Sequence, residues 1–386
     1  MKWKHLLRYP FDIRLAEEQL ASSAKLNVSK PNSVKSCATI GLDLYTDKML
    51  FDCARHLACL SAFAAQIDSP VVLRCSRVLL AAIAHKSLGK EFLAMPHVRW
   101  IEPGHHFPKN SLVLLDIDGE RADRPLYDQR TVAMLIGRDP VAKTMVMPYP
   151  MHPNQIAQFD AVQVASFRRQ FKAGVFFAGS QHRRYGREAM HEKFGVLSRL
   201  EMLDVLRRQF GDRIARRDAG GNDRKIVLRD SAKEPIAAAD WMSILSSHQF
   251  FLCCPGASQP VCHNVIEAMS LGVVPIIEYG DRFDPELIDG YNSICFEGRK
   301  GLAAAIRRID TMPPEKRNRL SRNVCQYYDD HLDGAAFLKR LRDELNTDFV
   351  DQISMPFHDQ NLYSTGSPPS GRVPASRRKA LDRNAA

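Results

Sequence analysis

The segment with the most chemical information runs from Phe250 to Pro285 and reads FFLCCPGASQPVCHNVIEAMSLGVVPIIEYGDRFDP. It predicts a buried strand, a glycine-bearing loop, a helix that begins near His263, and a second strand. A helix N-terminus favours an anion, because its N–H groups are free and its dipole is positive there, so a phosphate would bind where loop meets helix. Glu267 lies one turn into this helix, where a carboxylate would accept hydrogen bonds from the two hydroxyls of a ribose. Strand–loop–helix units also occur without a ligand, and Glu267 would then be a solvated surface residue. The residues alone leave both interpretations open.

The elements around this segment alternate between continuous apolar strands and amphipathic helices. That alternation is typical of a parallel sheet covered on both faces. Gly272 follows the helix at the C′ position, where only glycine is free of strain. The predicted strands are 70–75, 98–101, 111–117, 131–136, 143–147, 174–178, 225–228, 250–254 and 273–277. The predicted helices are 46–67, 77–95, one carrying 196–210, a helical turn at 240–247, 263–271 and 334–345.

A proline-rich stretch from Met147 to Pro153 separates two halves of the chain. Its prolines hold the backbone extended and remove hydrogen-bond donors, so a regular element does not continue through them. We place an N-terminal domain at 1–155 and a C-terminal domain at 156–350. A basic tail at 364–386, rich in Pro, Ser, Gly and Arg, is expected to be disordered. Ligands bind at the carboxyl ends of parallel strands, so we expect one in the cleft between the halves.

The composition is that of a soluble globular enzyme, with 386 residues, 45% hydrophobic and 25% charged. The sequence shows neither a run of about 20 apolar residues, as a membrane span needs, nor a signal peptide. The nine cysteines are scattered and form no CxxC pair, which favours reduced thiols in a cytosolic protein and gives no support to zinc. The net charge of +10 gathers in residues 168–233 and in the tail, which favours an anionic ligand such as a phosphate, a nucleotide, a nucleic acid or an acidic lipid surface.

The run EAMSLGVVPI, which begins at Glu267, resembles the EAMxxGxxP(V/I) signature of glycosyltransferases with the GT-B fold. Within that fold it is most similar to the exostosin family, whose members read FCLxPxG, then Ser-x-Arg, then EAxxxGxxPVI. Upstream the family has FFxG followed by an arginine, and this chain has Phe176 to Gly179 (FFAG) and then Arg187. The resemblance covers residues 145–300. It implies an α/β chain with two Rossmann-like parallel-sheet domains facing a central cleft, and transfer of a sugar from a nucleoside diphosphate donor, usually UDP-linked.

The resemblance also implies which residues hold the donor. Glu267 would bind the ribose, and the loop behind Gly256 would admit the diphosphate. Arg187 would offer its guanidinium to phosphate oxygens in a charge-assisted contact. Gly272 and Pro275 would be structural. The predicted donor site comprises Arg187, Gly256, Gln259, Cys262, His263, Asn264 and Glu267.

Two parts of the family pattern are replaced in this chain. The Ser-x-Arg motif, five and three residues before the glutamate, is here Cys262 and Asn264, so a diphosphate contact is weakened or moved. Arg183 or Arg184 could supply the missing charge. Other GT-B families carry a second glutamate eight residues before the first, and this chain has Gln259 there. An amide still bonds sugar hydroxyls, but it does not stabilise positive charge as a carboxylate does.

An inverting enzyme needs a general base for the acceptor hydroxyl, and in GT-B enzymes the N-terminal half supplies it. We take Asp116 and Asp118, at a strand end, and His152, in the linker, as the catalytic candidates. His105 and His106 fit a surface loop better. The Asp116-x-Asp118 pair is also similar to the metal-binding Asp-x-Asp of the other glycosyltransferase fold. We nevertheless expect no metal and no cofactor beyond the nucleotide-sugar co-substrate, because a helix N-terminus and basic residues neutralise the leaving diphosphate.

The resulting hypothesis is a cytoplasmic, exostosin-like glycosyltransferase. Its partners would be a nucleotide sugar and a saccharide or lipid-linked glycan acceptor, and a lipid-linked acceptor would bring it to the inner membrane face. A nucleic acid is not expected, because aromatic residues are not interleaved with the basic runs; binding to one would fall steeply with salt. Two alternatives stay open: a non-catalytic GT-B-like protein that binds a ligand or partner, and another GT-B enzyme such as a nucleotide-sugar epimerase.

Overall fold

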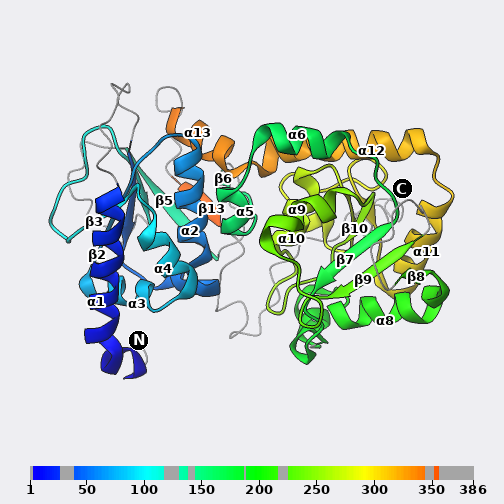
Figure 1. The fold of residues 1–386 in the computed structure, drawn as a ribbon, viewed down its shortest axis with the longest axis horizontal. Helices are drawn as coiled ribbons and strands as arrows, with labels where there is room; N and C mark the ends of the chain where they lie inside the picture. Colours follow the sequence, from blue (N-terminus) through cyan, green and yellow to red (C-terminus); the bar gives the residue numbers. More distant parts are fainter. Residues whose placement is uncertain are drawn as a thin grey trace, which may run out of the picture. The chain divides into compact units, whose positions relative to one another are not determined.

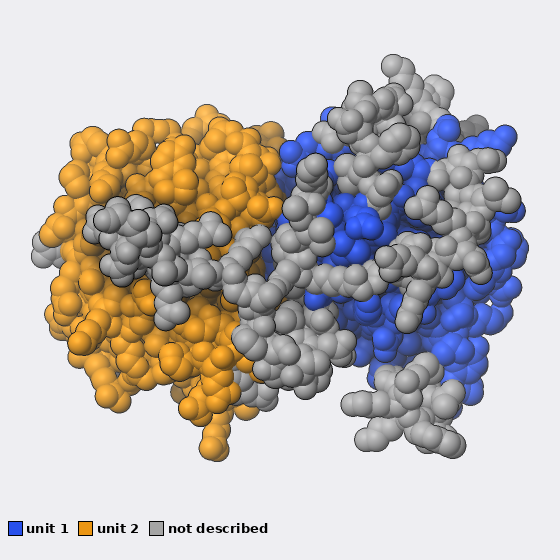
Figure 2. Space-filling view, turned by 180° about the vertical axis from the view of Figure 1, so that it is seen from behind, with its two compact units in different colours: residues 1–157, 333–364 blue, residues 158–332, 365–386 orange. Residues whose placement is uncertain are grey.

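The computed structural model describes residues 3–26, 39–116, 130–137, 144–186, 188–215, 225–343 and 352–355. These residues form two compact units (Figures 1 and 2). Among the described residues, the first unit contains the chain up to Ala157 and residues 333–355, and the second contains Gln158–Leu332. Each unit has its own parallel sheet with helices packed on it, which confirms the predicted α/β class with two Rossmann-like domains.

The first unit contains a seven-stranded sheet in the order β3-β2-β1-β4-β5-β13-β6, and all neighbouring pairs are parallel. From β1 the chain builds the sheet outward in one direction, and from β4 it builds in the other. The topological switch point, where ligands bind in such sheets, therefore lies between β1 and β4. The strands are β1 (Ile40–Leu44), β2 (Val71–Cys75), β3 (Val98–Ile101), β4 (Leu112–Leu115), β5 (Arg130–Ile136), β6 (Met145–Val146) and β13 (Gln352–Met355).

The helices of the first unit cover this sheet, with α1 packed on α3 and α4, and α2 packed on α4, α5 and α13. The single helix predicted over 77–95 is two helices, because Lys86 is extended (φ −87°, ψ 142°) and begins a new turn. Among the residues described, no helix combines the length and the apolar character needed to cross a bilayer. The helices are α1 (Trp3–Leu26), the 3-10 turn η1 (Lys48–Leu50), α2 (Phe51–Gln66), α3 (Arg77–Ala84), α4 (Ser87–Ala94), α5 (Pro153–Ala157) and α13 (Gly334–Asp343).

The C-terminal part of the chain returns to the first unit, which differs from the predicted domain boundary at residue 350. Helix α13 packs on α2, and β13 lies between β5 and β6 in the first sheet. Residues 352–355 pair in parallel with 133–136. The predicted tail at 364–386 lies outside the described residues.

The second unit contains a six-stranded, fully parallel sheet in the order β12-β11-β10-β7-β9-β8. Strands β8 and β9 extend it on one side of β7, and β11 and β12 extend it beyond β10. Its switch point therefore lies between the neighbouring strands β7 and β10. The strands are β7 (Val175–Gly179), β8 (Ile214–Ala215), β9 (Ile226–Asp230), β10 (Phe250–Leu252), β11 (Val274–Ile277) and β12 (Ile294–Cys295).

Helix α8 of the second unit begins with a complete capping box, since Ser198 and Glu201 each bond the other's backbone N–H. The helical turn predicted at 240–247 is the nine-residue helix α9. The α-helices are α6 (Ala161–Arg169), α7 (Ala189–Phe194), α8 (Arg199–Phe210), α9 (Ala238–Ser246), α10 (His263–Ser270), α11 (Gly298–Asp310) and α12 (Pro314–Tyr327). The shorter turns are η2 (Arg183–Gly186), η3 (Gly211–Arg213), η4 (Gly280–Arg282) and η5 (Tyr328–Leu332).

Lys172 is buried in the second unit, where its Nζ donates to the carbonyls of Phe167 at 2.9 Å and Ser246 at 2.7 Å. Burial lowers the pKa of Lys172 to about 8. The unfolded chain holds this proton up to about pH 10.4, so between the two pKa values it binds more protons than the folded chain, and stability rises with pH. Between pH 8 and 9.5, we expect the free energy of unfolding of wild type, measured with urea, to rise by about 1–2 kcal/mol relative to that of Lys172→Met. Lys90→Met, at an exposed lysine, is the control, and a pH-independent difference for Lys172→Met would contradict the prediction.

Candidate functional site

The loops that follow β7 and β10 meet at the switch point of the second sheet. Strands β7 and β10 are neighbours, with Phe250 opposite Val175 and Phe251 opposite Phe176. Their carboxyl ends therefore lead side by side into residues 180–186 and 253–262. These are the two loops in which the sequence predicted the donor site. Ligands of doubly wound sheets bind at this position.

Arg199, the first residue of α8, joins the two loops. Its Nη1 donates to the Ser180 carbonyl at 2.9 Å, and its Nε and Nη2 donate to the Pro255 carbonyl at 3.2 and 3.0 Å. The guanidinium carbon lies 3.8 Å from the ring centroid of Tyr185. Arg199 is buried, so its positive charge is shielded from solvent and makes the electrostatic potential between the two loops more positive. Arg199 was not among the predicted site residues, although the Ser198-x-x-Glu201 capping box places it at a helix start.

Helix α10 begins at this switch point with a weak cap. Cys262 occupies the N-cap position, where Ser, Thr, Asp or Asn is usual, and its thiol makes no capping hydrogen bond. Asn264 turns its side chain to the sheet, and its Nδ2 donates to the Ala178 carbonyl at 3.2 Å. His263 is half-buried at the first helical position. The first turn of α10 is therefore tied to β7 and lacks a strong side-chain acceptor for its N–H groups.

Gly256 lets the loop before α10 close on itself. Its N–H donates to the carbonyl of Gln259 at 2.9 Å and, less closely, to that of Pro260 at 3.3 Å. A Cβ at Gly256 would lie 2.7 Å from the Gln259 carbonyl oxygen, so a larger residue does not fit without moving the backbone. Gly256 and Gln259 thus shape the loop through their backbones.

A buried tyrosine lies beneath this loop. Tyr279 is 1% exposed, and within the described residues its hydroxyl has no hydrogen-bond partner. Burial raises the pKa of Tyr279 well above its usual value, and the neighbouring thiols of Cys262 and Cys253 act in the same direction. Burial likewise raises the pKa of Cys262. A buried hydroxyl without a hydrogen-bond partner carries a free-energy cost, so a group that accepts a hydrogen bond from it would be stabilised.

Exposed cations border the loop after β7. Arg183 and Arg184 form the exposed turn η2, and Arg184 donates to the Tyr185 hydroxyl at 3.1 Å. In the described part of the chain Arg183 makes no hydrogen bond or ion pair. Arg187, the arginine predicted from the FFxG pattern, lies outside the described residues. Arg183 is thus an exposed cation available to an anion at this loop.

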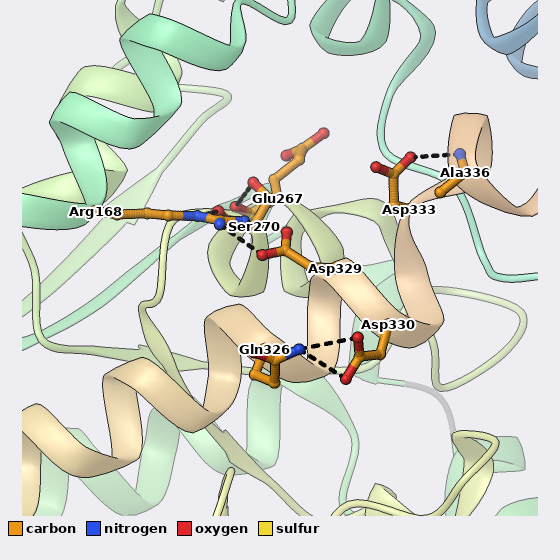
Figure 3. Close-up of polar contacts among 8 residues, drawn as sticks. All are labelled: Arg168, Glu267, Ser270, Gln326, Asp329, Asp330, Asp333 and Ala336. Carbon is orange, nitrogen blue, oxygen red and sulfur yellow. Dashed lines mark hydrogen bonds and ion pairs between the residues drawn. The ribbon is translucent and has the colours of Figure 1, made fainter. Parts of the chain in front are cut away.

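The carboxylate of Glu267 is enclosed within the second unit, not solvated on its surface. Glu267 is 1% exposed, and its Oε2 accepts a hydrogen bond from the Trp241 indole Nε1 at 2.6 Å. Figure 3 shows this carboxylate pointing away from Arg168, which instead donates to the Ser270 carbonyl at 2.8 Å and pairs with Asp329. Trp241 was not among the predicted site residues, and its partner Glu267 lies 26 residues further along the chain.

In the first unit, Asp116 stabilises the loop that follows β1. Its carboxylate accepts from the N–H groups of Tyr45 at 2.8 Å and Thr46 at 2.9 Å, and from the Thr46 hydroxyl at 2.7 Å. Burial raises the pKa of Asp116, and these hydrogen bonds oppose the rise. Asp116 therefore lies at the switch point of the first sheet, but its oxygens are engaged by the backbone. Asp118, the other predicted carboxylate, lies outside the described residues.

His152 is half-buried next to the start of α2. Burial lowers its pKa, the charge of Arg55 lowers it further, and Asp52 opposes both. Asp52 and Arg55 form an ion pair at 2.9 Å. Asp52, Cys53 and Ala54 are three consecutive non-glycine residues with positive φ, at 48°, 62° and 65°. This left-handed conformation costs about 1–2 kcal/mol per residue. Backbone strain of this kind concentrates at functional sites.

Comparison with known proteins gives only distant likenesses. No family model matches the sequence, and no curated protein does. Similar solved structures include a glycosyltransferase from Rickettsia africae, with 8% identity, 81% of this chain and 100% of that chain covered, and a TM-score of 0.47. Another is the N-terminal domain of Candida albicans trehalose-6-phosphate phosphatase, with 8% identity, 81% of this chain and 98% of that chain covered, and a TM-score of 0.43. A third is WaaG, a glycosyltransferase involved in lipopolysaccharide biosynthesis, with 10% identity, 80% of this chain and 100% of that chain covered, and a TM-score of 0.36. At TM-scores below 0.5 these likenesses carry no argument about activity, and the exostosin resemblance stays a prediction.

Proposed function

We propose that the chain is a GT-B glycosyltransferase, similar to exostosins, that transfers a sugar from a nucleoside diphosphate to a saccharide or glycoconjugate acceptor. UDP-sugar is the favoured donor, and the transfer would invert the anomeric centre without a metal. One observation carries the proposal. The N-terminus of α10, the exposed Arg183 and the buried Glu267 all belong to the loops and helix at the switch point of the second sheet.

The donor diphosphate would bind at the first turn of α10. A thiol is a weak acceptor, so a phosphate oxygen would be a stronger acceptor than Cys262 for the N–H groups of the first turn. Arg183 would add a charge-assisted contact. Together these groups would stabilise the negative charge that develops on the leaving diphosphate.

The ribose would bind at Glu267, one turn further along α10. Two vicinal hydroxyls are well matched to a carboxylate, which accepts hydrogen bonds at both oxygens. The 1% exposure of Glu267 means that a ribose would reach it only after the Trp241 side chain moves. A carboxylate buried in this way is costly unless it is hydrogen-bonded, which favours a ligand that restores the bond.

The acceptor would bind in the first unit, with His152 as the general base. The lowered pKa of His152 keeps its imidazole neutral near pH 7, so it would accept the proton of an acceptor hydroxyl. Asp116 fits this role less well, because three hydrogen bonds already occupy its carboxylate.

The test is thermal stabilisation by UDP, GDP, ADP and CMP, measured on wild type and on Glu267→Ala. A ligand at a hundred times its dissociation constant adds about 2.7 kcal/mol of stability, which is readily seen as a rise in melting temperature. We expect UDP to stabilise wild type, Glu267→Ala to lose the effect, and Arg183→Ala to weaken UDP binding several-fold. Arg99→Ala, at an exposed arginine in the first unit, is the control and should bind like wild type.

Two other results would change the proposal. If none of the nucleotides stabilises wild type, the donor site is not where we place it. If UDP binds but no nucleotide is released from UDP-sugars with any acceptor tried, the chain is a ligand-binding protein with this fold. If wild type does transfer sugar, His152→Ala tests the assignment of the general base, because it should abolish transfer while UDP still binds.

A further inference from the structure

Trp241 makes a hydrogen bond to the buried carboxylate of Glu267. Its indole N–H donates to Oε2 at 2.6 Å. Trp241 itself is half-buried, whereas Glu267 is 1% exposed. A ribose hydroxyl that bonds this carboxylate needs a position within hydrogen-bonding distance of an oxygen. The indole N–H already holds such a position.

The helix that carries Trp241 is loosely packed. Of the nine residues of α9, only Leu245 and Ser246 are buried, and both lie at its C-terminal end. Trp241 is in the first half, where its ring contacts Phe176 at a centroid distance of 6.0 Å and a tilt of 43°. Segments with few buried contacts open at low free-energy cost. The contacts that hold the indole include the bond to Glu267 and this tilted ring contact.

We propose that Trp241 is a displaceable cover that makes the site selective for ribonucleotides, an inference that rests on the proposed function. When a nucleotide binds, a ribose hydroxyl replaces the indole N–H as the donor to Glu267. The number of hydrogen bonds to the buried carboxylate is then unchanged. A nucleotide without ribose hydroxyls would displace the indole and leave the carboxylate without that bond, which is the situation in which sites discriminate most strongly.

The affinity test uses UDP, or whichever of UDP, GDP and ADP stabilises wild type. Trp241→Phe keeps an aromatic ring but removes the competing N–H, so we expect about tenfold tighter UDP binding, equivalent to about 1.4 kcal/mol. Wild type should bind 2′,3′-dideoxyuridine diphosphate about a hundredfold more weakly than UDP. Isothermal calorimetry gives both values.

The second measurement leaves Trp241 intact, so it does not depend on how Trp241→Phe folds. The chain has three tryptophans, and a Trp3→Phe, Trp100→Phe background makes Trp241 the sole indole fluorophore. Saturating UDP should shift its emission to longer wavelength as the ring moves into water, and Trp241→Phe in the same background should give no signal.

The outcomes separate this inference from the proposed function. Weaker UDP binding by Trp241→Phe would mean that the indole positions Glu267 and does not cover it, and would overturn the inference. Unchanged affinity, unchanged emission or equal binding of the dideoxy analogue would also overturn it, while the donor site stood. If wild type binds no nucleoside diphosphate, the proposed function fails, and this inference fails with it.

Discussion

Replacing Asp43 with alanine is expected to lower the free energy of unfolding by about 3–5 kcal/mol, because it leaves the Arg74 guanidinium buried without its carboxylate. Nε and Nη2 of Arg74 donate to the two Asp43 oxygens at 2.9 and 2.6 Å. Asp43 is 1% exposed and Arg74 is 7% exposed. Arg74 also donates to the His105 carbonyl at 2.9 Å and lies 4.5 Å from the Phe107 ring centroid. It therefore cannot turn to solvent without breaking these contacts as well.

The measurement is urea unfolding of Asp43→Ala beside the double variant Asp43→Leu, Arg74→Met. The double variant removes both charges and fills the space with apolar groups, so it should recover most of the lost stability. Arg14→Ala breaks an exposed pair with Glu18 and should change stability by less than about 0.5 kcal/mol. A loss below about 1 kcal/mol for Asp43→Ala would show that the buried pair contributes little to this fold.

The alternation of apolar runs and amphipathic helices predicted the class of the fold and most strands of the two parallel sheets, but not β1, β8, β12 or β13. Runs such as Phe250–Leu252 and Val274–Ile277 are buried along their whole length, so their sequence carries the signal of an inner parallel strand. The glycine after α10 was also predictable, because a left-handed C′ position is a local backbone property. These features depend on neighbours in the sequence.

Features that depend on distant parts of the chain were not predictable in this way. The apolar stripe of α13 does not indicate which unit the helix belongs to. Its packing on α2 places it in the first unit. The bond between Trp241 and Glu267 joins two helices whose sequences give no sign of each other. The position of Asp116 at a strand end was predictable from the sequence, whereas its hydrogen bonds to Tyr45 and Thr46 appear only in three dimensions.

Gly272→Ala is expected to lower the free energy of unfolding by about 3 kcal/mol, from two additive causes. Gly272 has φ +71°, and a left-handed conformation costs a residue with a side chain about 1–2 kcal/mol. A Cβ there would also lie 2.6 Å from Cys325 Sγ and 2.9 Å from Ser321 Oγ, both on α12. Overpacking of this kind costs about 1–3 kcal/mol. Ser321 moreover donates to the Gly272 carbonyl at 2.5 Å, so α12 cannot shift away without losing that bond.

Gly195→Ala separates the two causes. Gly195 ends α7 with φ +68°, but a Cβ there would meet nothing within 4 Å, so only the backbone cost of about 1 kcal/mol is expected. The difference between the variants in urea unfolding therefore measures the contact of α12 with the turn after α10. Since that turn joins α10 to β11, relief of the clash would move α10 itself, and Gly272→Ala should also weaken UDP binding while Gly195→Ala does not. Equal losses of stability in the two variants would mean that α12 adapts to the added methyl group, and α10 would then keep its position at the donor site.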